Sequence, residues 1–176
     1  MKGAVATIDA ALASDTMATG KYLTFFLGDE EYGIGITRVK EIIGKMPITP
    51  VPRTPLFIKG VINLRGKVIP VIDLRSRFDM EEVGYTDRTC ILVVEIDTAS
   101  LSILTGIVVD SVSEVLSIKK SEIEPPPAFG ETRLNSDYIL GLAKLEDGVK
   151  ILLNVDQVLA GQEITGIEQA AKMTTD

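Results

Sequence analysis

The chain has 176 residues, a net charge of -7 and no histidine. This length is enough for one large domain or two small ones with a buried core. A hydrophobic content of 45% with 24% charged residues is typical of a folded protein rather than a disordered one. The lack of histidine removes the commonest general base and the commonest metal ligand, and with only one cysteine a structural zinc site is excluded.

The composition also bears on the compartment. The single cysteine, Cys90, lies in the apolar run CILVV and is typical of a small buried side chain. It leaves no possible disulfide within the chain, which favours a reducing compartment. No apolar stretch reaches the roughly 18–20 residues of a membrane span, and Asp9 and Asp15 interrupt the N-terminal alanines where a signal peptide would be apolar. We therefore expect a cytoplasmic protein.

The first third of the chain predicts a tail, a hairpin, a helix and an arm. Residues 1–20 are rich in Ala, Thr and Ser and predict a mobile tail, and from Lys21 the runs YLTFFL and YGIGI predict two strands joined by the turn GDEE. Thr37 is typical of a helix N-cap, so that a short helix is predicted over RVKEIIG, ending at Gly44. An extended arm is indicated next by four prolines, Pro47, Pro50, Pro52 and Pro55.

Residues 57–75, FIKGVINLRGKVIPVIDLR, predict a β-hairpin. Two apolar runs flank an Arg65-Gly66 corner, whose glycine supplies the backbone freedom for a sharp reversal. From Arg53 to Arg77 the chain carries six basic residues and one acidic residue, Asp73. A basic hairpin in an acidic chain is a candidate binding surface, although a solvated basic face without any role has the same pattern.

The rest of the chain predicts further strands and one helix. After a polar loop over residues 76–89, the runs CILVVEI, LSILTGIVV and VSEVLSI predict three strands. A proline-bearing loop precedes a second hairpin, ILGLAKL and VKILL, which we expect to turn at Asp147-Gly148. Asn154 is placed to cap a final helix, VDQVLAG, and residues 161–176 predict a C-terminal tail. The chain is therefore expected to be mainly β, with two or three short helices.

The chain also repeats itself. The run VKEII at residues 39–43 matches VSEVL at 112–116, and the I-x-G hairpin that begins at Ile58 matches the one that begins at Ile139. The proline arm recurs between them, with Pro50-Val51-Pro52 falling on Ile123-Glu124-Pro125.

This order predicts two β units of about five strands each, over approximately residues 21–80 and 88–160. Small antiparallel units of this kind usually curl into barrels, which removes most exposed edges. A groove between two barrels suits a partner's helix.

No catalytic constellation is present. Gly33 and Gly35 are not followed by a glycine-rich turn into a helix, no phosphate-binding loop occurs, and the acidic run Asp29-Glu30-Glu31 is typical of a solvated turn. An RNA-binding β-barrel is an alternative of a different class for the basic hairpin. Such a surface needs aromatic side chains for base stacking, whereas the hairpin offers only Phe57.

Several stretches together resemble the CheW family, the coupling proteins of bacterial chemotaxis. The most specific is TPLFIKGVINLRGKVIPVIDLR at residues 54–75. The others, in chain order, are FFLGDEEYGI, VKEI, GIVVDSVSEVLSI, IEPPPAFG and YILGLAKLEDGVKILLNVDQVL. The resemblance covers residues 21–160 and leaves both tails outside. One departure is Gly35, where many members of the family carry an acidic residue.

The resemblance implies a mainly β fold over residues 21–160, in which two small five-stranded SH3-like β-barrels pack around a shared core and are intertwined in a single domain. It also implies a non-catalytic adaptor without cofactor, metal or nucleic acid. Such an adaptor bridges the cytoplasmic tip of methyl-accepting chemoreceptors to the regulatory domain of the CheA histidine kinase, and meets the membrane only through the receptors of the array. A CheW-like adaptor of a non-flagellar chemosensory system is an alternative that these motifs do not separate.

The resemblance further implies a receptor-binding patch. In family members the VKEI and NLRG motifs meet at a groove, which implies a partly buried ion pair between Glu41 and Arg65. Core packing is the alternative for the two aliphatic residues of VKEI. The motifs do not identify the residues that contact the kinase. The receptor-facing residues implied by the motifs are Val39, Glu41, Ile42, Lys59, Gly60 and Arg65.

Overall fold

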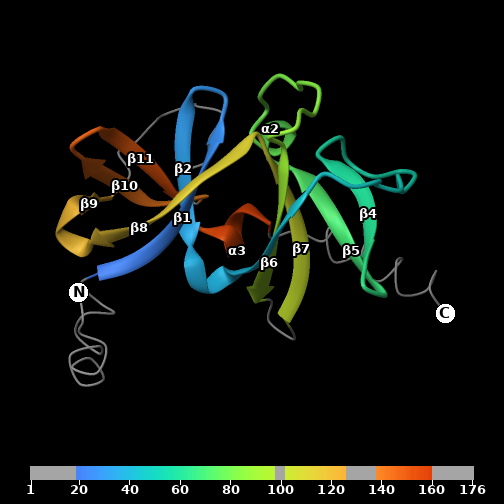
Figure 1. Cartoon of the computed structure of the whole chain (residues 1–176), viewed down its shortest axis with the longest axis horizontal. Coiled ribbons are helices and arrows are strands. Elements are labelled where there is room, and N and C mark those ends of the chain that lie inside the picture. Colours follow the sequence, from blue (N-terminus) through green and yellow to red (C-terminus); the bar gives the residue numbers. More distant parts are fainter. Residues whose placement is uncertain (1–18, 98–101, 126–137, 160–176) are drawn as a thin grey trace.

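Two β-sheets make up the part of the protein that the computed structural model describes, residues 19–97, 102–125 and 138–159 (Figure 1). The first sheet has six strands in the order β8-β1-β2-β11-β10-β9. These strands are β1 (Thr19–Leu27), β2 (Glu30–Gly35), β8 (Ser111–Lys119), β9 (Ile123–Glu124), β10 (Ile139–Leu145) and β11 (Gly148–Leu153). The second sheet has five strands in the order β3-β6-β7-β5-β4. These strands are β3 (Val39–Gly44), β4 (Ile58–Leu64), β5 (Lys67–Asp73), β6 (Cys90–Asp97) and β7 (Ser102–Val109).

The prediction of a mainly β fold with a few short helices is confirmed. The described helices are η1 (Ile36–Arg38), α2 (Leu74–Arg77), η2 (Lys120–Glu122) and α3 (Val155–Val158). The predicted Asn154 cap is present, because the Asn154 side chain accepts a hydrogen bond from the backbone N–H of Gln157. Closure of the sheets into SH3-like barrels stays a prediction.

The predicted helix over RVKEIIG is wrong. Only a 3₁₀ turn forms at its start, and Val39–Gly44 is strand β3, which pairs antiparallel with β6. Val39, Ile42 and Ile43 have helical spacing, but β-branched side chains favour a pleated strand. Pairing with β6 also satisfies the backbone groups at what would otherwise be an open sheet edge.

Two smaller expectations at the turns and termini also change. Thr19 and Gly20 were predicted to be tail but belong to β1, while residues 1–18 and the predicted C-terminal tail lie outside the described part. In the second hairpin Leu145 pairs with Gly148, so that the two-residue loop is one position earlier than predicted.

The internal repeat is visible as a matched order of strands. In the sheet orders, β8-β1-β2-β11-β10 corresponds position by position to β3-β6-β7-β5-β4. Among these five corresponding strands, each sheet takes two from one half of the chain and three from the other. The predicted ranges, residues 21–80 and 88–160, separate the two repeats along the sequence. Neither range supplies all strands of a sheet. The parallel pairs β5·β7 and β11·β2 each join a strand of one range to a strand of the other.

Equivalent glycines mark where the arms cross the hairpins. A Cβ on Gly60 would lie 2.0 Å from the carbonyl oxygen of Thr49, and a Cβ on Gly141 would lie 2.4 Å from Cγ2 of Ile123. Thr49 forms a bridge to Val61, just as Ile123 of β9 pairs with β10. The I-x-G repeat therefore exists because an arm lies against the first strand of each hairpin.

The core has three parts. The largest cluster lies between the two sheets and takes buried side chains from both, among them Phe25 and Ile34 from the first sheet and Leu92 and Ile107 from the second. A smaller cluster around Ile62 lies within the second sheet, and another around Ile118 within the first. The predicted shared core is the largest of these clusters.

Candidate protein-binding surface around Glu41 and Arg65

The backbone of the β4–β5 turn fixes where Arg65 stands. Arg65 and Gly66 both have positive φ, 52° and 88°, which is the two-residue hairpin turn that matches the twist of the flanking strands. The Asn63 side chain accepts a hydrogen bond of 2.8 Å from the Gly66 N–H and holds the turn closed. Arg65 therefore projects from a rigid corner, as the sequence predicts. The role of Asn63 was not predicted, although its position two residues before the corner is a turn signal.

Glu41 meets Arg65 across the ends of the sheet. In the strand order of the second sheet, β3 and β4 are the two outermost strands, yet the Arg65 guanidinium makes a two-point hydrogen bond to the Glu41 carboxylate, from Nη1 to Oε2 at 3.0 Å and from Nη2 to Oε1. The sheet must curl for these edges to meet. The ion pair implied by the motifs is present in the structure.

The electrostatics of this pair are those of a surface interaction. The hydrogen bond from Arg65 holds the pKa of Glu41 below its usual value, and the same contact raises the pKa of Arg65. The side chain of Arg65 is 70% exposed and that of Glu41 is 31% exposed, so that the pair lies nearer the surface than expected. Solvent screens exposed pairs strongly, and the contact therefore fixes geometry more than it stabilises the fold.

The two aliphatic residues of VKEI differ in their surroundings. Val39 packs against the main core between the sheets, which agrees with the core-packing alternative. Ile42 is 45% exposed, although it pairs with Leu92 and so faces the same side of the sheet as that core. Glu41 points to the opposite face, because successive side chains alternate along a strand. A partner lying along the free edge of β3 can therefore touch both Ile42 and the ion pair.

Lys59 and Gly60 do not lie in the same patch as Arg65. Lys59 stands near the start of β4, while Arg65 follows its end, and six strand residues span about 20 Å. The Lys59 ammonium pairs with Glu82 in the loop after α2. Gly60 is buried beneath the arm at Thr49. The motif places these two residues beside the pair in sequence, but the extended strand carries them away.

We call Glu41, Ile42 and Arg65 the β3-edge surface. It consists of one ion pair and one exposed aliphatic side chain. Among the described residues no group of three or more acidic or cysteine side chains is placed to hold a metal ion. No helix in the described part is both long and apolar enough to cross a membrane.

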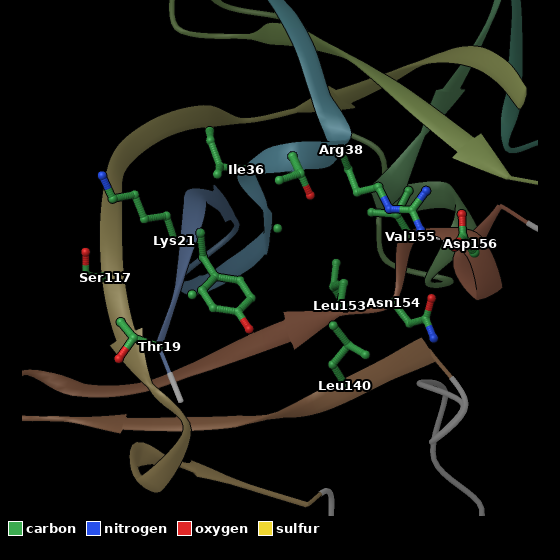
Figure 2. Close-up of a pocket in the computed structure, with 14 residues that line it drawn as sticks. Thr19, Lys21, Ile36, Arg38, Ser117, Leu140, Leu153, Asn154, Val155 and Asp156 are labelled. Atoms are coloured by element: carbon green, nitrogen blue, oxygen red, sulfur yellow. Dashed lines mark hydrogen bonds and ion pairs between the residues drawn. The ribbon is translucent and has the colours of Figure 1, made fainter. Parts of the chain in front are cut away.

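A pocket of about 910 Å³ lies elsewhere, on the first sheet (Figure 2). The start of β1, η1 and α3 line it. Arg38 points toward Asp156 and donates a hydrogen bond of 2.6 Å to it, and Leu140 of β10 and Leu153 of β11 also line the pocket. The sequence did not predict this pocket, because its walls come from elements far apart in the chain.

Comparisons with known proteins identify the family. The family model described as CheW-like domain matches residues 21–163. The chain is 40% identical over 161 residues to "Chemotaxis protein CheW" of Klebsiella aerogenes, covering 92% of this chain and 93% of that protein. It is 41% identical over 139 residues to "Chemotaxis protein CheW" of Bacillus subtilis, covering 79% of this chain and 86% of that protein.

A solved structure agrees with these relatives. The crystal structure of the scaffolding protein TtCheW from Thermoanaerobacter tengcongensis superposes with a TM-score of 0.73 at 37% identity, covering 82% of this chain and 94% of that one. The two-sheet fold, the VKEI and NLRG motifs joined by the Glu41–Arg65 pair, and these matches over most of the chain give one conclusion: the protein belongs to the CheW family.

Proposed function

We propose that this protein is a non-catalytic adaptor that couples methyl-accepting chemoreceptors to the CheA histidine kinase in chemotaxis arrays. The observation that carries the proposal is the family match over residues 21–163, together with an intact Glu41–Arg65 pair at the edge of β3. The names of the relatives place them in chemotaxis, and that of the solved structure describes a scaffold. The protein acts in the cytoplasm and reaches the membrane through the receptors.

The β3-edge surface is the receptor-binding site in this proposal. The tip of a chemoreceptor is a helical hairpin, and a helix laid along the edge of β3 meets an aliphatic side chain, Ile42, beside a fixed pair of opposite charges. Aliphatic contact supplies affinity, and the oriented pair supplies register and specificity. Val39 supports this strand from the core side, while Lys59 and Gly60 act on the arm and loop rather than on the receptor.

Substitutions in the pair test this assignment. Arg65→Ala and Glu41→Ala should each weaken binding to a receptor signalling fragment about tenfold, because each removes one half of the oriented pair. The free energy of unfolding should change little, since the pair is exposed. Isothermal titration calorimetry measures the first quantity, and urea unfolding the second.

The matched control is another exposed ion pair. Lys144 and Glu124 form a salt bridge between β10 and β9, with side chains 61% and 53% exposed. Lys144→Ala should leave receptor binding unchanged. If Arg65→Ala and Lys144→Ala bind the receptor fragment equally well, the β3 edge is not the receptor site.

The kinase site is separate from the β3-edge surface. The proposed partner is the CheW-like regulatory domain of CheA, and substitutions on the β3-edge surface should leave the affinity of this protein for that domain unchanged.

An adaptor of a non-flagellar chemosensory system would have the same surfaces. Binding assays with both sets of receptors and kinases distinguish these two systems, because a coupling protein should prefer its cognate pair.

A further inference from the structure

Two partly buried ion pairs each join a short helix to the link between two strands. Arg75 of α2 donates hydrogen bonds of 2.8 and 2.6 Å to the carboxylate of Asp110, which lies between β7 and β8. Arg38, at the end of η1 between β2 and β3, points toward Asp156 of α3 and donates a hydrogen bond of 2.6 Å to it (Figure 2). No more than 32% of any of these four side chains is exposed. We call them the two helix–link pairs.

The helix–link pairs occupy equivalent places in the repeat, with opposite signs. Arg75 and Asp156 each lie two residues after the residue that caps their helix. The link at Arg38 leads from β2 to β3, and the link at Asp110 leads from β7 to β8, which are the equivalent strands in the two sheet orders. The first repeat therefore supplies both cations, and the second repeat supplies both anions.

The backbone pairing that joins the repeats does not by itself distinguish the partners. In the parallel pair β5·β7, Val71 lies opposite Gly106, and in β11·β2, Leu152 lies opposite Gly33. A Cβ on Gly33 would lie 2.9 Å from Leu152, and a Cβ on Gly106 would lie 3.4 Å from Val71. Both pairs thus place a branched aliphatic side chain against an equivalent glycine, so that β5 beside β2 would fit in a similar way. Chains built of similar repeats are prone to such misassembly.

The charges do distinguish the two arrangements. If β5 paired with β2 of its own repeat, α2 would bring Arg75 to Arg38. If β11 paired with β7, α3 would bring Asp156 to Asp110. A partly buried charge that meets its own sign is left uncompensated, which is costly. In the observed arrangement each cation meets an anion, and the hydrogen bond from Arg75 holds the pKa of Asp110 below its usual value.

The surroundings of α3 also favour an anion on the helix. The carboxylate of Asp97 accepts a hydrogen bond of 3.2 Å from Arg38, and the backbone N–H of Asp97 donates one of 3.1 Å to Asp156. An arginine brought to this place by α2 would meet a guanidinium and an N–H donor where Asp156 now accepts two hydrogen bonds.

We propose that the two helix–link pairs select the exchange of strands between the repeats. Each repeat carries a single sign at its helix and at its link, so that it repels its own helix and accepts that of the other repeat. The selection depends on the pattern of signs and not on which repeat is the basic one, and this gives the proposal a test by charge inversion.

NMR spectroscopy of the full chain, refolded from urea, tests the proposal, because nuclear Overhauser effects show whether Val71 lies beside Gly106 or beside Gly33. The wild-type chain should give one set of signals, with Val71 beside Gly106. Arg75→Asp combined with Asp110→Arg keeps both observed pairs complementary, but it also makes the pairing of each repeat with itself complementary. We therefore expect a second set of signals, roughly a tenth of the total or more, with Val71 beside Gly33.

Two further variants use the same logic. Arg38→Asp combined with Asp156→Arg inverts only the other pair and should also give a second set of signals. All four substitutions together invert both pairs, so that each repeat again carries a single sign, and the second set should disappear. The net charge of the chain is the same in every variant.

The matched control inverts an ion pair that lies outside the helix–link pairs. Lys144→Glu combined with Glu124→Lys changes the exposed salt bridge between β10 and β9 and should leave a single set of signals.

Four results would overturn the proposal. A single set of signals in both singly inverted variants means that the charges select nothing. A second set that persists when both pairs are inverted means that the substitutions only loosen the fold. A second set whose share grows with protein concentration means that strands exchange between two copies of the chain. Loss of the folded spectrum in both singly inverted variants would also contradict the proposal, because each keeps two complementary pairs.

Discussion

At the scale of single residues, the site depends on groups that hold Arg65 in place. The guanidinium reaches Glu41 because Arg65 and Gly66 take up a turn that needs positive φ at both positions, and because Asn63 closes that turn. The bound carboxylate then orients the guanidinium at two points. A lysine at this position would keep the charge and lose the orientation.

Gly60 gives the clearest prediction about stability. Its φ is 141°, and a Cβ would lie 2.0 Å from the backbone oxygen of Thr49. Gly60→Ala must therefore strain the backbone or push the arm away, and should lower the free energy of unfolding by about 2 kcal/mol or more. Urea unfolding followed by circular dichroism measures this change.

Gly44 provides the comparison for this substitution. It ends β3 in the same sheet, its φ is not in the left-handed region, and no atom lies within 4 Å of the Cβ it would carry. Gly44→Ala should change the free energy of unfolding by about a few tenths of a kcal/mol at most, as expected for an open surface position. Equal effects of the two substitutions would mean that the arm does not press on Gly60.

At the scale of elements, the two short helices of the repeat differ in their caps. Asp73 caps α2 by accepting a hydrogen bond of 3.0 Å from the Arg75 N–H, and its equivalent, Asn154, caps α3. Burial raises the pKa of Asp73 above its usual value, and nearby Lys59 offsets this only in part. At the same cap position, the first half of the chain therefore has a buried carboxylate and the second half has an amide.

This difference predicts a pH dependence. Because the folded-state pKa of Asp73 is raised, the folded protein binds a proton that the unfolded chain releases, so that the stability from this group falls as the pH rises through the folded pKa. Asp73→Asn keeps the cap acceptor and cannot ionise. It should raise the free energy of unfolding more at pH 7 than at pH 4, as measured by urea unfolding at both values.

Asp29→Asn serves as the control, since Asp29 is exposed in the β1–β2 turn. It should have the same small effect at both pH values. A loss of stability in Asp73→Asn that is equal at pH 4 and pH 7 would show that the carboxylate is not strained by burial.

Strand β3 shows that local sequence alone can predict the wrong secondary structure. Its spacing of aliphatic residues and a preceding threonine favour a helix, but the edge of β6 needs a strand partner, and this tertiary requirement prevails. The hairpins were predictable because alternating apolar residues and a glycine corner are local signals. The Lys59–Glu82 contact could not be predicted from the sequence, because it depends on the path of the loop after α2.

At the scale of the whole molecule, the two copies of the repeat exchange strands. The sequence shows two copies of one plan over consecutive residue ranges, and the family resemblance implies that the two units are intertwined. The structure exchanges strands between the copies, so that parallel contacts of β5 with β7 and of β11 with β2 bridge the halves. Sequence similarity locates the copies, but it carries no information on which copy supplies each strand of a sheet.

The exchange predicts how fragments behave. Residues 19–87 contain strands β1 to β5 and residues 88–159 contain β6 to β11, so that neither fragment can complete a sheet. Each fragment alone should be unfolded by circular dichroism and NMR, and the two should regain the native spectrum when they are mixed. A native-like spectrum from either fragment alone would contradict the exchanged topology.

In the proposed function, this protein places CheA under receptor control through the β3-edge surface. The most direct test mixes a receptor signalling fragment, CheA and this protein, and measures autophosphorylation of the kinase. Wild-type protein and Lys144→Ala should both make the kinase respond to the receptor, whereas Arg65→Ala should leave the kinase at its receptor-independent rate. Receptor control that is equally strong without this protein, or with Arg65→Ala, would contradict the proposed function.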